Sequence, residues 1–297
     1  MSHEGHELRE QTWSSALSVW AKGQADLSAL VQVGSRVQPD GEADAYSDFD
    51  YYLISSRPER YRDGRFAEAI APCWAVSSQM AFGGVTKVTA VYEHALDVDF
   101  VILTAWELRV AFLALRFPRL KAWWPGPLAN GIADLRCVAG RGSRVVHGGA
   151  GWSRRFERLA PLPLTPTEAA FSHACDIFWT QFVWVVKKVE RGELLAAQRG
   201  FHLHLVESTL TILAMEADEA GRPRPEGRKA EQWLSSDRLR SMAITSAPST
   251  EVLEHALADL AFLFHDASQA VAKQRGWAFN QREGLRMWTA RRGYWET

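Results

Sequence analysis

The amino-acid sequence predicts an α+β protein, with a mixed β-sheet in its N-terminal half and an all-helical bundle in its C-terminal half. Short β-favouring segments separated by turn residues recur through residue 103, and helix-period apolar patterns dominate from Thr165 onward. The length of 297 residues also suits two domains of about 100 to 200 residues each. We place the boundary near residue 155, which gives predicted domains of residues 1–155 and 156–297.

An opening helix, four strands and two shorter helices are predicted in the N-terminal half. The opening helix is expected over residues 8–22, where apolar side chains recur at near-helical spacing. The strands are expected at residues 27–33, 47–54, 85–92 and 95–103, and the shorter helices at residues 65–70 and 106–117. Aromatic and β-branched residues fill these strands, and turn residues separate them. Together they predict a small mixed sheet.

Long helical patterns fill most of the C-terminal half. They predict helices over residues 168–191, 194–217 and 251–275. Thr165 is the predicted N-cap of the first of these, with Pro166 at its first helical position. Residues 140–166 are rich in Gly, Pro and Arg, which indicates a linker between the halves.

Composition and charge exclude several classes of protein. Hydrophobic residues make up 47% and charged residues 23% of the chain, which is ordinary for a folded protein. The net charge of -1, with Lys and Arg spread along the chain, does not favour binding to nucleic acid. The N-terminus lacks the layout of a signal peptide, and no apolar run reaches the roughly 18 residues of a membrane span. We therefore expect a cytoplasmic protein without a membrane partner, whose three cysteines are reduced and structural.

Two aspartates alternate along the second predicted strand. Because side chains on a strand alternate between its faces, Asp48 and Asp50 point the same way, with about 7 Å between their Cα atoms. Two carboxylates this close resist joint ionisation unless a cation lies between them. Carboxylate oxygens suit Mg²⁺, which commonly binds through one or two carboxylates together with substrate phosphates. The pair therefore predicts a magnesium site that also takes a nucleotide.

A third acidic group comes from the last predicted strand. Asp97 and Asp99 share one face of that strand, so from the residues alone both are candidates. Three carboxylates can hold two metal ions about 4 Å apart for in-line phosphoryl chemistry, so we expect two Mg²⁺ ions. The third acid would also lie close to the attacking oxygen, where it can help to activate it.

A glycine turn follows the first predicted strand. Gly34 allows the backbone to approach a phosphate closely, and the hydroxyl group of Ser35 and the N–H groups after it can donate hydrogen bonds to that phosphate. Arg36 adds a positive charge nearby. The order of strand, Gly-Ser turn, loop and Asp-x-Asp strand predicts a unit that binds a triphosphate at one end and a metal at the other.

These motifs, with Gly-Ser-Arg at residues 34–36, Tyr-Ser-Asp-Phe-Asp at 46–50 and Val-Asp-Phe at 98–100, resemble the signature of the DNA polymerase β-like nucleotidyltransferase superfamily. The longer pattern, Gly-Ser-Arg followed by a polar loop and Tyr-Ser-Asp-Phe-Asp, is most similar to that of the aminoglycoside 6-adenylyltransferases, antibiotic-resistance enzymes that adenylylate streptomycin. That family pairs an N-terminal nucleotidyltransferase domain with a C-terminal helical domain. Phe178-Trp179 and residues 191–195 are reminiscent of its helical domain, although the specific motifs lie in the N-terminal half.

The resemblance assigns roles to individual residues. It favours Asp99 over Asp97 as the third acid, because Val98-Asp99-Phe100 better matches the family's sequence pattern of an acidic residue between two apolar residues. The implied catalytic and metal-binding residues are Asp48, Asp50 and Asp99, and the implied nucleotide-binding residues are Gly34, Ser35, Arg36 and Ser47. The implied reaction is a Mg²⁺-dependent transfer of AMP from ATP to a hydroxyl group of a streptomycin-like aminoglycoside, with release of pyrophosphate.

The acceptor is less sharply defined than the reaction. Aminoglycosides are polycations, and Glu93, Asp97, Asp176 and Glu193 are candidate contacts for one in the substrate-binding region. Residues 145–149 (VVHGG) stand where such enzymes often carry an acidic strand end, so contacts of that region cannot be transferred. Alternatives are another small molecule such as a lincosamide, a protein hydroxyl group, or a nucleotide-binding module without catalysis. A monomer or a homodimer is expected.

Overall fold

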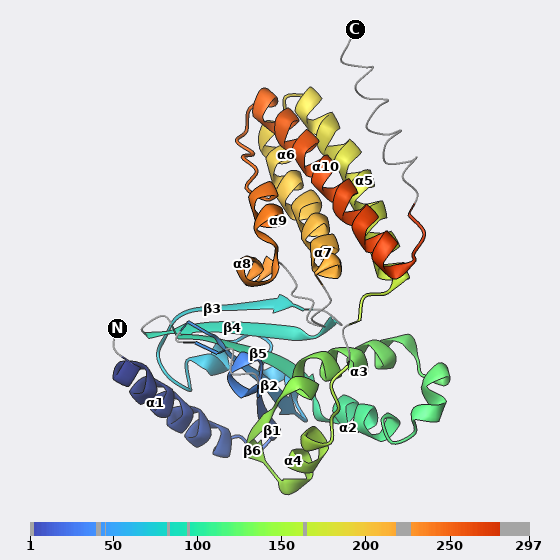
Figure 1. Ribbon diagram of the computed structural model, residues 1–297. Helices are drawn as coiled ribbons and strands as arrows, with labels where there is room; N and C mark the ends of the chain where they lie inside the picture. Colours follow the sequence, from blue (N-terminus) through green and yellow to red (C-terminus); the bar gives the residue numbers. More distant parts are fainter. Residues whose placement is uncertain are drawn as a thin grey trace. The chain divides into compact units, whose positions relative to one another are not determined.

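The computed structural model describes residues 3–39, 43–44, 46–81, 84–93, 96–162, 165–217 and 227–279. The chain folds into two compact units, residues 1–163 and 164–297 (Figure 1). The first contains a six-stranded sheet with helices and the second is mostly helical, so the predicted α+β class is confirmed. The functional division into residues 1–155 and 156–297 stays a prediction. Within the described residues, none of the helices is both long and apolar enough to cross a lipid bilayer.

The sheet of the first unit is mixed, as the sequence predicts. Its strands are β1 (Leu27–Val33), β2 (Phe49–Ser55), β3 (Cys73–Met80), β4 (Thr86–Tyr92), β5 (Leu96–Thr104) and β6 (Arg144–Gly148), in the order β3-β4-β5-β2-β1-β6. Strands β2 and β5 run parallel, and the other neighbouring pairs run antiparallel. The parallel pair lies at the centre of the sheet, where both strands have a partner on each side.

Helices cover both faces of this sheet, because its central strands carry apolar side chains in both directions. Helix α1 (His3–Lys22) packs Trp13 and Leu17 against one face. Helices α2 (Ala105–Ala114), α3 (Gly126–Val138) and α4 (Ala150–Glu157) bury Phe112, Leu135 and Trp152 on the other face. Tyr52 of β2 belongs to this second core, and since side chains alternate along a strand, Asp50 lies on the same face.

Two local predictions are wrong and one strand was missed, each for a physical reason. The predicted linker 140–166 contains β6, which pairs with β1, and also α4; this edge strand has only five residues and is flanked by glycines, which hides its pairing. Strand β3 was not predicted, because nearly all of its residues are exposed and so show no apolar alternation. The helix predicted at residues 65–70 is only a 3₁₀ turn, Arg65–Ala67.

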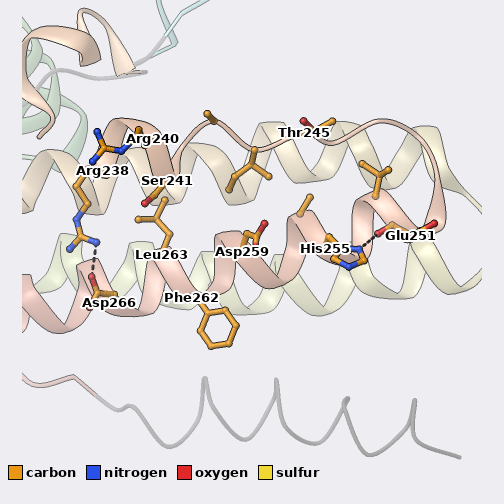
Figure 2. Close-up of a pocket in the computed structure, with 14 residues that line it drawn as sticks. Arg238, Arg240, Ser241, Thr245, Glu251, His255, Asp259, Phe262, Leu263 and Asp266 are labelled. Atoms are coloured by element: carbon orange, nitrogen blue, oxygen red, sulfur yellow. Dashed lines mark hydrogen bonds and ion pairs between the residues drawn. The ribbon is translucent and has the colours of Figure 1, made fainter. Parts of the chain in front are cut away.

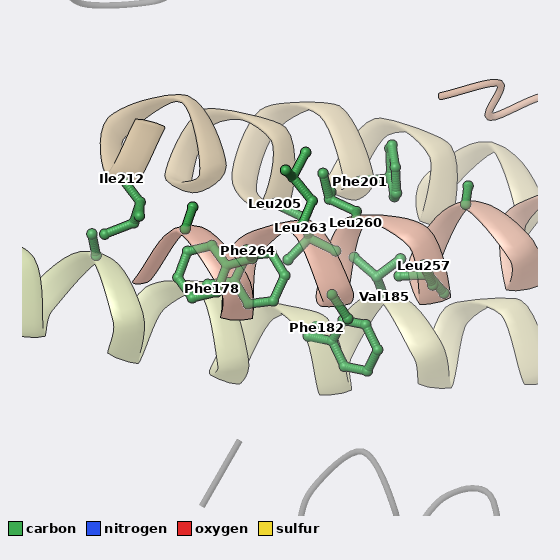
Figure 3. Close-up of a cluster of buried hydrophobic side chains, with 14 of the residues drawn as sticks. Phe178, Phe182, Val185, Phe201, Leu205, Ile212, Leu257, Leu260, Leu263 and Phe264 are labelled. Atoms are coloured by element: carbon green, nitrogen blue, oxygen red, sulfur yellow. The ribbon is translucent and has the colours of Figure 1, made fainter. Parts of the chain in front are cut away.

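The second unit is built from helices α5 (Glu168–Glu190), α6 (Leu194–Gly200), α7 (Glu207–Glu216) and α10 (Thr250–Arg275), with a π-helical segment Phe201–Val206 between α6 and α7 and the short helices α8 (Ala230–Trp233) and α9 (Ser236–Ser241). These elements confirm the three predicted helical stretches. In the core, the rings of Phe178 and Phe264 stack with centroids 3.7 Å apart (Figure 3).

The N-cap of α5 differs from the prediction. Thr167 is the cap, because its hydroxyl oxygen accepts a hydrogen bond from the backbone N–H of Ala170 at 3.1 Å. The N-cap therefore lies two residues after Thr165, and the helix begins at Glu168, so that Pro166 precedes it.

Candidate active site

The sheet brings three aspartates together at one point. Asp50 of β2 and Asp99 of β5 are direct partners in the register of the parallel pair. Asp48 lies immediately before β2, two residues from Asp50. One carboxylate oxygen from each of the three side chains lies within 4.8 Å of the others. Among the described residues with His, Cys, Asp or Glu side chains, these three form the group with the spacing of a metal site.

The carboxylate of Asp99 is held by two residues of the neighbouring strand β4. Thr89, its partner in the β4–β5 register, donates its hydroxyl hydrogen to Oδ1 at 2.5 Å. Lys87, two residues earlier on the same face, places Nζ 2.6 Å from Oδ2. Asp99 is buried, so these two contacts fix the direction in which its oxygens point.

Lys87 is the cation that offsets the charge of this acidic group. Partial burial acts to lower the pKa of its ammonium group, but the hydrogen bond and charge of Asp99, with the charges of Asp50 and Asp48, raise that pKa above its usual value. The sequence analysis missed both Lys87 and Thr89. The alternation of strand 85–92 contained the signal, because it places these two polar side chains on one face.

Gly34 stands directly against Asp50. Its backbone φ of 79° lies in the left-handed region that favours glycine. An added Cβ would overlap Oδ2 of Asp50. Val33, the last residue of β1, pairs with Asp50 across the β1–β2 register, so the strand pairing sets this approach. The glycine is therefore required here for space beside a carboxylate as well as for the turn.

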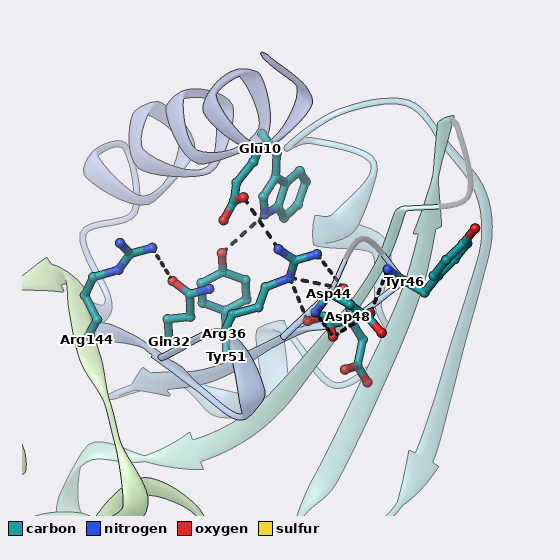
Figure 4. A network of polar contacts seen from close by, with 10 residues as sticks. Glu10, Gln32, Arg36, Asp44, Tyr46, Asp48, Tyr51 and Arg144 are labelled. Atoms are coloured by element: carbon teal, nitrogen blue, oxygen red, sulfur yellow. Dashed lines mark hydrogen bonds and ion pairs between the residues drawn. The ribbon is translucent and has the colours of Figure 1, made fainter. Parts of the chain in front are cut away.

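Arg36 fastens the segment that carries Asp48 (Figure 4). Its guanidinium group donates hydrogen bonds to the backbone oxygens of Ser47, at 2.7 and 3.1 Å, and of Asp48, at 3.2 Å. It also lies 3.5 Å from a carboxylate oxygen of Glu10 and 3.9 Å above the ring centroid of Phe49. These contacts make Arg36 a positioning residue for the aspartates. Its predicted contact with a triphosphate stays a prediction.

The remaining predicted nucleotide contacts lie near the same turn. Ser35 begins a 3₁₀ turn, Ser35–Val37, directly after Gly34. The hydroxyl group of Ser47 donates a hydrogen bond to Oδ1 of Asp44 at 3.0 Å and accepts one from the N–H of Asp44 at 2.9 Å. These two hydrogen bonds link Ser47 to Asp44 within the polar loop. The predicted roles of both serines in nucleotide binding stay predictions.

The four predicted acceptor contacts do not join the three-aspartate group. Asp97 and Glu93 are exposed at the beginning of β5 and the end of β4. Asp176 is exposed on α5 of the helical unit. Glu193, between α5 and α6, forms an ion pair with Lys188. The structure therefore separates Asp97 from the metal-site geometry, and the roles of all four in acceptor binding stay predictions.

The helical unit has a hollow of its own, of about 860 Å³, along α10 (Figure 2). Glu251 and Asp259 of α10 line it, together with Arg238 at one end. The guanidinium group of Arg238 is already neutralised, because it forms ion pairs with Glu216 and Asp266, each at 2.6 Å. Asp176 and Glu193 are not among the lining residues.

Hard oxygen donors, a glycine turn and a fixed cation give the three-aspartate group a defined chemistry. Its carboxylates offer Mg²⁺ the ligands it prefers, and leave the rest of an octahedral shell to phosphate oxygens or water. The position of Lys87 shows that the group already takes a positive charge next to Asp99. Groups of this kind support phosphoryl transfer, in which catalysis is mainly positioning and charge neutralisation.

The comparison with known protein families gives a match in the C-terminal half of the chain. The family model described as streptomycin adenylyltransferase matches residues 160–289, which is 130 of the 297 residues. This match lies outside residues 34–100, which hold the motifs that carried the resemblance in the sequence. The expected resemblance is therefore confirmed from the helical region, in which the sequence carried only the weaker signals at Phe178-Trp179 and residues 191–195. A search of curated proteins gives no significant match.

Two solved structures are also similar to the chain. One is an aminoglycoside 6-adenyltransferase from Bacillus subtilis, with 14% identity and a TM-score of 0.42 over 94% of this chain and 97% of that one. The other is a nucleotidyltransferase-like protein from Exiguobacterium sibiricum, with 13% identity and a TM-score of 0.36 over 89% of this chain and 77% of that one.

Proposed function

We propose that this chain, whose residues 160–289 match the streptomycin adenylyltransferase family model, is a nucleotidyltransferase that transfers AMP from ATP to a hydroxyl group of a streptomycin-like aminoglycoside. The reaction releases pyrophosphate. The observation that carries this proposal is the convergence of Asp48, Asp50 and Asp99 beside the Gly34 turn. It joins a site for a divalent cation to a backbone turn of the kind that accepts phosphates.

The three aspartates would hold Mg²⁺, with two ions expected. When bound, Mg²⁺ neutralises phosphate charge and orients the phosphates for in-line displacement. The chain prepares this site in advance. Thr89 and Lys87 orient Asp99, and Arg36 fixes the backbone before Asp48. Preorganisation of this kind lowers the cost of rearranging the site during the reaction.

The chemistry of the residues suggests which protein groups would bind the phosphates and which would act on the acceptor. Gly34 and Ser35 would bring backbone and hydroxyl donors to the triphosphate. Asp99 would accept the proton of the attacking hydroxyl group, since it is the third acid of the site. Carboxylates such as Asp176 would bind the ammonium and guanidinium groups of the acceptor.

The test is an incubation of the purified protein with ATP, Mg²⁺ and streptomycin, followed by measurement of pyrophosphate and of the streptomycin mass. We expect a mass increase equal to one AMP unit, and at least a 100-fold loss of kcat/KM in Asp48→Asn. Asp63→Asn is the matched control, because Asp63 is an exposed aspartate that pairs with Arg65 away from the site. Full turnover by Asp48→Asn would contradict the assignment of the site.

A panel of acceptors in the same assay tests the substrate. A mass increase on a lincosamide or on a protein, with streptomycin unchanged, would keep the chemistry and refute the aminoglycoside. Parallel reactions with GTP and UTP would identify the nucleotide, since the added masses differ.

A further inference from the structure

A groove lined by arginines lies between α2 and α4 of the first unit. Its volume is about 660 Å³. The lining includes Arg109 on α2, Arg116 in the turn after it, and Arg154, Arg155 and Arg158 at α4 and its end. In the linear sequence these cations look dispersed, because about forty residues separate the two groups. Folding collects them around one hollow.

The packing of the two helices explains this gathering. Helix α4 turns Trp152 and Phe156 toward the sheet, and α2 turns Phe112 toward the same core. The ring of Phe112 meets that of Phe156 with centroids 5.3 Å apart, and that of Trp152 at 6.4 Å. This aromatic contact holds the helices side by side, so their outward faces, which carry the arginines, form the walls of the groove.

Among the described residues, no carboxylate pairs with the arginines of the groove, although the guanidinium group of Arg155 lies 5.2 Å from the ring centroid of Trp152. Within the part of the chain that the structure describes, Arg109, Arg116, Arg154 and Arg158 form no ion pair and no side-chain hydrogen bond. Arg155 donates only to the backbone oxygen of Gly151, at 3.2 Å. Arg36 and Arg238, in contrast, lie against carboxylates. Five like charges around one hollow repel one another and create a positive potential that favours an anion.

The side chains define the class of anion. A guanidinium group presents parallel N–H donors that fit phosphate oxygens in pairs, so several arginines suit a chain of phosphates. The volume lies within the range of about 300 to 1,000 Å³ typical of sites for small molecules. Leu113 and Leu159 add apolar surface to the lining. A concave site of this size favours a small ligand over an extended nucleic-acid backbone.

We propose that this arginine groove binds a small ligand that carries several phosphate groups, either a free oligophosphate or the phosphate chain of a nucleotide. The site is separate from the three aspartates, none of which lines the groove. Its chemistry also differs, because arginines neutralise phosphates directly whereas carboxylates require a divalent cation. The groove therefore binds its ligand without metal, and the inference does not rest on the proposed enzymatic function.

The test is a calorimetric titration of the full chain with inorganic triphosphate in the presence of EDTA, which removes metal-dependent binding at the aspartates. We expect one triphosphate per chain, and at least tenfold weaker binding in Arg154→Ser/Arg158→Ser. The matched control is Arg57→Ser/Arg62→Ser, which removes the same charge from exposed positions outside the groove and should bind as tightly as the unmodified chain.

Further arms identify the source of the phosphates. Binding of ATP at least as tight as that of triphosphate supports a nucleotide, and binding of triphosphate alone supports a free oligophosphate. The proposal is overturned if triphosphate does not saturate the protein, if both double variants lose affinity equally, or if a long RNA binds tightly while triphosphate does not.

Discussion

Replacing Lys87 with methionine tests how the acidic site is held together. The substitution keeps an unbranched side chain of similar length and removes the charge that lies 2.6 Å from Oδ2 of Asp99. A hydrogen bond to a charged group contributes about 1.5 to 3 kcal/mol, and Asp99 is buried while Lys87 is partly exposed, so we expect a loss of about 2 kcal/mol without metal. At about 2 to 4 °C per kcal/mol for a unit of this size, Tm falls by about 4 to 8 °C.

The same substitution should strengthen the binding of divalent cations. Lys87 and a metal ion both neutralise the three aspartates, so the metal must displace or oppose the ammonium group in the unmodified chain. A release of about 2 kcal/mol corresponds to about 30-fold tighter binding, at 1.4 kcal/mol per tenfold change. Mn²⁺ binding measured by calorimetry, and Tm measured with and without Mg²⁺, report the two effects. Lys121→Met, at an exposed position, is the control. Unchanged Tm together with equal or weaker Mn²⁺ binding would refute this reasoning.

Three further predictions concern the site and its surroundings. Gly34→Ala should lower kcat/KM at least tenfold and weaken Mn²⁺ binding, because the added Cβ overlaps Oδ2 of Asp50; calorimetry showing unchanged Mn²⁺ affinity would contradict this. Asp97→Asn should leave Mn²⁺ affinity within about twofold, since Asp97 lies outside the three-aspartate group; a tenfold loss would make it a ligand. Burial raises the pKa of Tyr51 to about 12, so the unfolded chain releases this proton first as pH rises, and unfolding in urea should become about 1 kcal/mol easier between pH 9 and pH 11. Tyr51→Phe should lack this part of the pH dependence.

The sequence carries most of the information that places the aspartates. Asp50 stands in a strand whose aromatic and β-branched residues identify it, Asp48 stands directly before that strand, and Asp99 stands in another such strand. What the sequence does not contain is the order of the strands. The direct pairing of Asp50 with Asp99 depends on a parallel neighbour about fifty residues away, and alternation along a single strand says nothing about which strand lies next to it.

The residues that support the aspartates were harder to predict. Lys87 and Thr89 act through the β4–β5 register, so their contacts with Asp99 follow from pairing and leave no motif in the sequence. Arg36 is expected to contact a phosphate because it follows Gly34-Ser35, and no pattern in the sequence indicated that its guanidinium group also bonds to the backbone of Ser47 and Asp48. The arginine groove shows the same limit, because charge was judged along the chain while packing decides where charge gathers in space.

The central parallel pair also makes the first unit suitable for reassembly from two pieces. A cut between β3 and β4 would leave Asp48 and Asp50 on one fragment and Lys87 and Asp99 on the other. Neither fragment alone would hold all three carboxylates, so divalent-cation affinity would return only when β2 and β5 find each other in the correct register. Metal binding would then serve as a reporter for complementation between the two halves of the sheet.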